Sequence, residues 1–218
     1  NTPFIYDSSD PKRSPEKDGG NDDFDGIGWK GNAKNILTIG AVNDVLNYTG
    51  PGSVSLASFS NFGPTDDGRI KPDLVGNGIS LESSGALSDN DYYFSSGTSM
   101  SAPNVTGSLA LLQEHYLETH SNVPMRASTL KALAIHTARE CGTATGPDYR
   151  FGWGLLSAAD AAEVISQDTL NPQTILEDTL ANGNQQSFSF KAAGNQPLRI
   201  TLAYTDEPGP SQNALNST

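Results

Sequence analysis

A change of hydrophobic period near residue 99 constrains the fold of this chain more than any other feature. Before it, short apolar runs are separated by turn residues. Residues 36–42 form an almost continuous β-rich run that suits a strand buried on both faces of a parallel sheet. After it, apolar residues recur at steps of three and four from Ala102 to Tyr116, the spacing of one helical stripe. Short strands followed by helices predict an α/β domain.

Small side chains cover much of the remaining surface of that helix, so we expect it to be buried on most sides. Pro103 falls in its first turn, where a missing N–H costs nothing. Shorter patterns place the other elements of the same domain. The expected elements are strands at residues 57–62 and 72–75 and helices at residues 126–141 and 157–166.

The character of the chain changes again after residue 166. Residues 187–191 and 198–204 alternate with period 2 around a turn-rich stretch, which is typical of an antiparallel hairpin. We therefore expect residues 1–166 to form a parallel-sheet domain, and residues 167–218 to form a linker and the first strands of a β-sandwich. Because the chain opens without an initiator Met and stops just after the hairpin, we expect a fragment cut from a longer protein at both ends, with both domains incomplete.

Composition narrows the classes of partner. Asp and Glu total 25 against 13 Lys and Arg, which gives a formal net charge of −12. Polyanions would repel such a chain, so nucleic acid and anionic membrane surfaces are poor partners. No apolar run approaches the ~20 residues needed to span a bilayer. The single cysteine, Cys141, cannot form an internal disulfide and is expected to be a small buried residue.

Ser99 stands where a glycine-containing loop runs into the start of the first helix. Free backbone N–H groups and the positive end of the helix dipole stabilise negative charge that develops at such a position. A serine there could attack a carbonyl and donate its own N–H to the resulting oxyanion. The alternative is that Ser99 caps the helix, because serine is among the preferred capping residues.

The string Gly-Thr-Ser-Met-Ser-Ala-Pro at residues 97–103, followed by x-Val-x-Gly, closely resembles the signature around the catalytic serine of the subtilisin-like serine proteases, the subtilases. Further segments resemble other parts of that family, at residues 34–42, 59–65, 67–73 and 151–156. The resemblance covers roughly residues 18–166. It implies a serine endopeptidase that hydrolyses peptide bonds through an acyl-enzyme on Ser99, with Thr98 supporting the oxyanion. The tail is similar to the β-sandwich appended in some large bacterial subtilases.

The rest of the catalytic apparatus is not found in these residues. A subtilase triad runs Asp, His, Ser along the chain, whereas all three histidines here follow Ser99 and none is followed by Gly, as the family's His-Gly-Thr motif requires. We therefore expect His115, His120 and His136 to be structural. The Asn donor of the family's oxyanion hole has no supported counterpart before residue 34.

Two functional hypotheses follow from the missing residues. The first is an endopeptidase in the full-length parent, of which this fragment alone is inactive because it lacks the catalytic Asp and His. The alternative is a catalytically inactive subtilase homologue that acts as a binding or adhesion module. The sequence upstream decides between them.

The resemblance also implies the setting of the enzyme. We expect a polypeptide substrate, no cofactor for the chemistry, and a secreted, extracellular bacterial enzyme, while the oligomeric state stays open. Asn21, Asp23 and Asp25, followed by Gly26, form the first half of a calcium loop, but position 32 is Asn where a closing Glu is required. A structural calcium ion and a solvated acidic loop are both open interpretations of this stretch.

Overall fold

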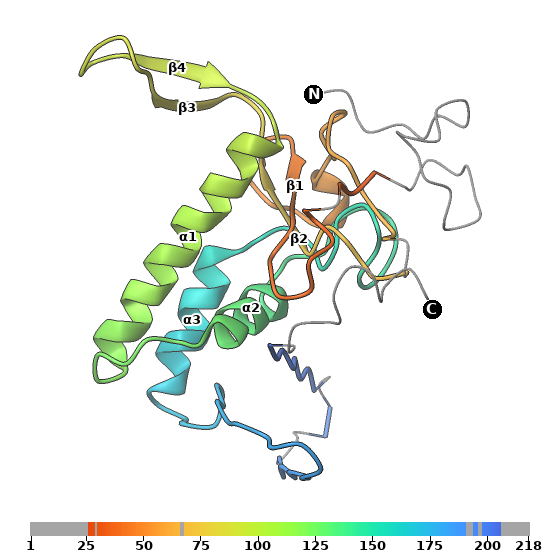
Figure 1. The fold of residues 1–218 in the computed structure, drawn as a ribbon, viewed down its shortest axis with the longest axis vertical. Helices are drawn as coiled ribbons and strands as arrows, with labels where there is room; N and C mark the ends of the chain where they lie inside the picture. The colour runs from red at the N-terminus through yellow and green to blue at the C-terminus, as the bar shows by residue number, and fades with distance from the viewer. Residues whose placement is uncertain (1–25, 29, 66–67, 191–193, 196–197, 206–218) are drawn as a thin grey trace.

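The computed structural model describes residues 26–28, 30–65, 68–190, 194–195 and 198–205. Within them the chain forms two small sheets and three α-helices (Figure 1). In chain order the elements are β1 (Ile39–Val42), the 3-10 turn η1 (Pro51–Ser53), β2 (Leu74–Asn77), β3 (Leu81–Ser84), β4 (Tyr92–Ser95), α1 (Thr98–Thr119), α2 (Ala127–His136) and α3 (Ala158–Asp168). The expected α/β class is confirmed.

The centre of the fold is the parallel pair β1 and β2, in which Ile39 lies opposite Leu74 and Val42 opposite Asn77. Four of its apolar side chains have no exposed surface, as the β-rich run predicted, while Ile39 at the start of β1 is half-buried. The four are Ala41, Val42, Leu74 and Val75. The helix α1 packs directly on this pair because β2 carries a glycine at the contact. A Cβ added at Gly76 would lie 2.6 Å from Val105 Cγ2.

The three helices pack together below the sheet (Figure 1) and bury a second apolar cluster. That cluster consists of Leu112, Met125, Leu133, Ala161 and Ile165. The expected stripe of α1 faces inward, since Val105 and Leu112 are buried. The expectation that α1 is buried on most sides is not met by the described residues, because Gly107, Ala110 and Leu111 are exposed.

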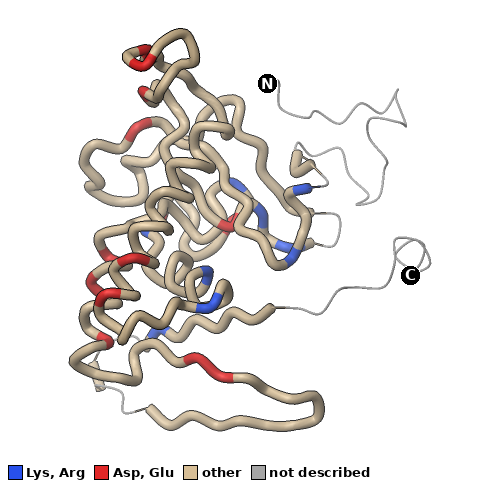
Figure 2. Tube along the Cα trace, turned by 60° about the vertical axis from the view of Figure 1, so that its left-hand side comes forward, with Lys and Arg blue, Asp and Glu red and all other residues tan. Residues whose placement is uncertain are grey.

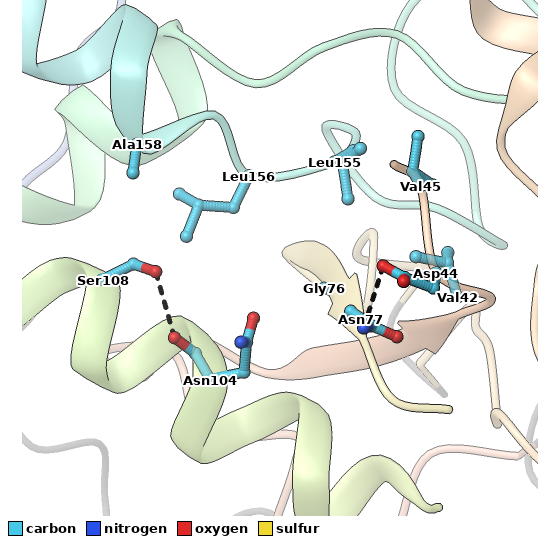
Figure 3. Close-up of a pocket in the computed structure, with 10 residues that line it drawn as sticks. All are labelled: Val42, Asp44, Val45, Gly76, Asn77, Asn104, Ser108, Leu155, Leu156 and Ala158. Carbon is cyan, nitrogen blue, oxygen red and sulfur yellow. Dashed lines mark hydrogen bonds between the residues drawn. The ribbon is translucent and has the colours of Figure 1, made fainter. Parts of the chain in front are cut away.

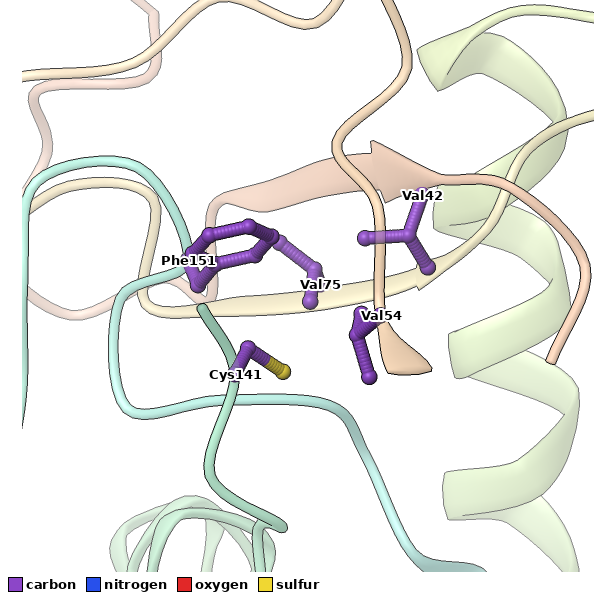
Figure 4. Close-up of a cluster of buried hydrophobic side chains, with 5 residues drawn as sticks. All are labelled: Val42, Val54, Val75, Cys141 and Phe151. Atoms are coloured by element: carbon purple, nitrogen blue, oxygen red, sulfur yellow. The ribbon is translucent and has the colours of Figure 1, made fainter. Parts of the chain in front are cut away.

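A separate apolar cluster lies against the sheet and contains the single cysteine. It consists of Val42, Val54, Val75, Cys141 and Phe151 (Figure 4). Cys141 is fully buried, as expected, but it does not end a helix. Helix α2 stops at His136 because the backbone of Arg139 then exchanges hydrogen bonds with Leu155, of 2.9 Å and 2.8 Å. The expected end at residue 141 is therefore wrong.

The segment that leads into α3 pairs with β2 at the edge of the sheet, as a third strand-like segment. The N–H of Val75 donates to Gly154 O at 3.0 Å, and the N–H of Leu156 donates to Val75 O at 3.1 Å. Gly152 makes this close approach possible, because its φ is 63° and a Cβ there would overlap the carbonyl oxygens of Pro72 and Asp73. Ser157 then caps α3, its side chain accepting a hydrogen bond from Asp160 N.

Three expected strands are not found in the described residues. Residues 57–62 form no strand, because the hydroxyl of Ser60 accepts a hydrogen bond from Ala41 N at 2.9 Å, in place of a backbone partner. In the tail, the parts of residues 187–191 and 198–204 that the structure describes carry no β-ladder. The β-sandwich and the boundary at residue 166 stay predictions.

One element was not expected from the sequence. An antiparallel hairpin, β3 and β4, stands out from the body just before α1 (Figure 1).

Among the described residues, no helix is long and apolar enough to cross a bilayer.

Candidate active site

Ser99 is the second residue of α1 and is exposed. The residue that caps this helix is Gly97, and no side chain caps it. Within the described part of the chain, the Ser99 hydroxyl has no hydrogen-bond partner. The geometry therefore does not support the alternative that Ser99 serves as a helix cap, and it leaves the hydroxyl available for chemistry.

The first turn of α1 offers two unpaired backbone N–H groups close to the Ser99 hydroxyl. The N–H groups of Met100 and Ser101 both donate to Gly97 O, at 3.0 Å and 3.2 Å. The N–H groups of Thr98 and Ser99 have no acceptor among the residues the structure describes. Together with the positive end of the helix dipole, they form a site that stabilises an anion next to the Ser99 hydroxyl. Thr98 is half-buried beside it.

The first turn is fixed to both strands of the parallel pair by Ser101, a residue that sequence reasoning did not single out. Its buried hydroxyl lies 2.7 Å from Gly40 O on β1 and 3.0 Å from Gly76 O on β2. The N–H of Gly97 also donates to Gly78 O at 2.8 Å. These bonds connect residues far apart in sequence, so no local pattern reveals them.

The three histidines lie away from Ser99 and have structural partners. His115 follows Ser99 by 16 positions in α1, a rise of about 24 Å along the helix axis. His115 Nε2 lies 2.9 Å from Ser166 Oγ. His120 stacks on Tyr116 and its Nε2 lies 3.1 Å from the carboxylate of buried Asp168.

The third histidine, His136, contacts the tail through Thr201 Oγ1, at 2.9 Å from its Nδ1. Burial, and secondarily the charge of Arg199, lower its pKa. The expectation that all three histidines are structural agrees with these contacts. In the described part of the chain, none of them forms a base for Ser99.

A buried ion cluster holds the segment before β2 in place. The carboxylate of Asp73 accepts from Lys71 Nζ at 2.5 Å and from Thr38 N at 2.7 Å, and it lies 3.3 Å from Lys131 Nζ. Burial lowers the pKa of Lys71, against the opposing effect of its hydrogen bond to Asp73. All the carboxylate's partners here are donors, so the cluster is a structural ion-pair network.

A cavity of about 180 Å³ lies at the carboxyl ends of β1 and β2, between α1 and the segment before α3 (Figure 3). Asn77 Nδ2 donates to Asp44 Oδ1 across one side of it at 3.1 Å. Its other polar lining comes from Asn104 and Ser108 of α1. The cavity does not include Ser99 and contains no histidine.

The candidate calcium loop cannot be examined in this structure, because Asn21, Asp23 and Asp25 lie outside the described residues. Elsewhere in the described chain, no group of three or more His, Cys, Asp or Glu side chains could hold a metal ion. Calcium binding stays a prediction.

Comparison with known proteins gives a consistent family match. The model of the subtilase family matches residues 19–154, more than half of the chain. A C5a peptidase of Streptococcus pyogenes is 45% identical over 92 residues, which are 42% of this chain and 8% of that protein. The chain thus spans less than a tenth of the length of this relative.

Solved structures agree with this match. The Clostridium perfringens CspB protease aligns with a TM-score of 0.50 and 28% identity, over 60% of this chain and 27% of that chain. The prenylagaramide maturation protease PagA aligns with a TM-score of 0.50 and 25% identity, over 66% of this chain and 47% of that chain. Both are proteases by name, and both share the α/β fold described above.

Proposed function

The chain belongs to the subtilase family, and from this premise we propose that it is the nucleophile-bearing part of a serine endopeptidase. The observation that carries the proposal is the geometry of Ser99. Its hydroxyl is exposed and unbonded within the described residues, and it lies in a helix turn that offers the unpaired N–H groups of Thr98 and Ser99. A matching family and a matching local geometry together favour a catalytic role.

In the proposed reaction, Ser99 Oγ attacks the carbonyl carbon of a peptide bond. A histidine base takes the hydroxyl proton and later gives it to the leaving amine. The Ser99 N–H donates to the oxyanion that forms, and Thr98 supports it. Water then hydrolyses the acyl-enzyme and restores the hydroxyl. The histidine and its aspartate would be supplied by sequence outside these 218 residues.

The proposed setting is extracellular, with a polypeptide as substrate. The supporting observations are the net charge of −12 and the bacterial relatives. Fractionation of a producing strain tests the location. Recovery of the full-length protein from the medium or the cell surface is expected, and its retention in the cytosol would contradict the proposal.

The alternative function, an inactive homologue used for binding or adhesion, receives no support from the described residues. It would be favoured by a full-length sequence that lacks the Asp and His-Gly-Thr motifs.

Substitution of Ser99 in the full-length protein tests the proposal. Ser99→Ala should reduce peptide turnover by about 10⁶-fold, because a triad acts as a unit. The melting temperature should be preserved, since the change deletes one exposed hydroxyl.

Ser128 offers a matched control, because it is the second residue of α2 just as Ser99 is the second residue of α1. Ser128→Ala should leave turnover unchanged. If Ser99→Ala kept its turnover and lost about 1 kcal/mol of stability, Ser99 would be a cap and the proposal would be wrong.

A further inference from the structure

The β3–β4 hairpin displays aromatic side chains that the described fold does not use. Tyr92, Tyr93 and Phe94 are 62%, 52% and 67% exposed. The hairpin stands out from the body (Figure 1), and among the described residues its two strands pair only with each other. Exposed aromatic groups rimmed by polar residues commonly mark an interaction surface.

The strand register places a carboxylate beside two of these rings. Glu82 lies directly opposite Phe94, and Ser84 lies opposite Tyr92. Because directly opposed residues of an antiparallel pair share a face, these four side chains lie on one side of the hairpin, here called the hairpin face. The Glu82 carboxylate has no hydrogen bond or ion pair in the described part of the chain.

The charge of the hairpin has one sign. Residues 79–96 include Glu82, Asp89 and Asp91 but no Lys, Arg or His. Figure 2 shows this acidic charge on the hairpin at the top of the view. Asp91 is engaged within the connection, where it accepts from Leu87 N at 3.0 Å. Glu82 is therefore an acidic residue without a partner in the described part of the chain, and it shares one side of the hairpin with two aromatic residues, a combination that attracts a cationic side chain.

The hairpin leads directly into the candidate active site. Only Ser96 separates β4 from Gly97, the cap of the helix that carries Ser99. The N–H of Ser80, just before β3, donates to Ser96 Oγ at 2.9 Å, which holds the base of the hairpin to this junction. The base of the hairpin therefore adjoins the helix turn that carries Ser99.

We propose that the hairpin face, formed by Glu82, Ser84, Tyr92 and Phe94, holds a Lys or Arg side chain of the polypeptide substrate near the bond that Ser99 cleaves. This inference rests on the proposed function. It makes the hairpin a specificity-determining element, which the core of the fold does not require.

Binding to the full-length protein that carries Ser99→Ala tests the inference without turnover. Two fluorescent peptides are compared, identical except that one carries Arg and the other norleucine at a single position near the cleavage site, and the position is scanned. At one or more positions the Arg peptide should bind roughly threefold to tenfold more tightly. Glu82→Gln and Phe94→Leu should each reduce this preference. Equal affinity of the two peptides at every position would overturn the inference.

Asp89→Asn provides the matched control. It removes the same unit of charge from the same hairpin, at an exposed residue outside the hairpin face. It should keep the Arg preference within about twofold. An equal loss in Asp89→Asn and Glu82→Gln would show a general charge effect and would also overturn the inference.

Hydrolysis by the wild-type protein separates the two proposals. Ser99-dependent cleavage without any Arg preference would overturn the hairpin proposal and leave the proposed function standing. Absence of Ser99-dependent cleavage of either peptide would overturn the proposed function, while the binding comparison would still report on the hairpin face.

Discussion

At the scale of single residues, two serines near helix starts differ in what their hydroxyl groups do. Ser157 lies just before α3, and its side chain accepts from Asp160 N at 3.4 Å. Ser99 is the second residue of α1, and its side chain caps none of the free N–H groups of that helix turn. Its hydroxyl has no hydrogen-bond partner within the described residues. Ser157 occupies the cap position and Ser99 lies two positions further into its helix, so the first hydroxyl is structural and the second is a candidate nucleophile.

Ser101 is expected to position the first turn that carries Ser99. In Ser101→Ala the carbonyls of Gly40 and Gly76 lose a buried donor, which should cost about 1–3 kcal/mol of unfolding free energy. Turnover of the full-length protein should fall about tenfold or more, because small displacements of a nucleophile slow attack. The control is Ser108→Ala, whose hydroxyl donates only to Asn104 O in its own helix. Equal effects of the two substitutions would argue against a positioning role.

Cys141 is expected to be chemically inert in the folded protein. Burial raises the pKa of its thiol to about 12, from an ordinary value of 9.0. Since the thiolate is the reactive form, iodoacetamide should not alkylate Cys141 at pH 8 until the protein unfolds. The unfolded thiol ionises at lower pH than the folded one, so the contribution of Cys141 to stability is complete below pH 9 and is lost as the pH rises toward 12. Rapid alkylation of the native protein would contradict this.

At the scale of elements, sequence patterns located α1, the buried part of β1 and the first half of β2, because burial imposes its period on the side chains. The second parallel strand was expected at residues 72–75 and runs from Leu74 to Asn77. These patterns failed where hydrogen bonds between residues far apart in sequence determine the bounds of an element. The hydroxyl of Ser60 replaces a backbone partner and removes the expected strand at residues 57–62. The bridge between Arg139 and Leu155 ends α2 early. The motif identified Ser99, but Ser101 needed the structure because its acceptors are 61 and 25 residues away.

A substitution at Gly152 tests whether the segment before α3 must lie as close to the sheet as the structure shows. Gly152→Ala adds a Cβ that would overlap the carbonyl oxygens of Pro72 and Asp73, at a positive φ of 63°. We expect this substitution to lower the free energy of unfolding by more than about 3 kcal/mol. Gly146→Ala is the control, because Gly146 also has a positive φ, of 86°, but no atom lies within 4 Å of an added Cβ. It should cost only about 1–2 kcal/mol. Thermal unfolding of both variants makes the comparison, and similar melting temperatures would contradict the packing argument.

At the scale of the whole molecule, α1 connects the candidate site to the core. Its first turn is bonded to the parallel pair, and its later turns pack against α2 and α3. At 22 residues it is about 33 Å long, so the apolar cluster around Leu112 holds the helix that presents Ser99. The geometry of the candidate site at the start of α1 therefore depends on packing along the rest of this helix.

The 218-residue chain alone is expected not to hydrolyse peptides. No histidine precedes Ser99 in the sequence, and those that follow it are engaged elsewhere. A fluorogenic peptide assay of the purified chain checks this. Turnover that disappears in Ser99→Ala would show that this chain supplies its own base, contrary to the account.

Trapping the acyl-enzyme shows directly whether Ser99 is the nucleophile. The full-length protein is mixed with a slowly deacylating ester, quenched in acid, digested and mapped by mass spectrometry. We expect an acyl adduct on the peptide that contains Ser99, its disappearance in Ser99→Ala, and its persistence in Ser128→Ala. Hydrolysis of the ester with the adduct on another residue, or with unchanged rate in Ser99→Ala, would contradict this expectation.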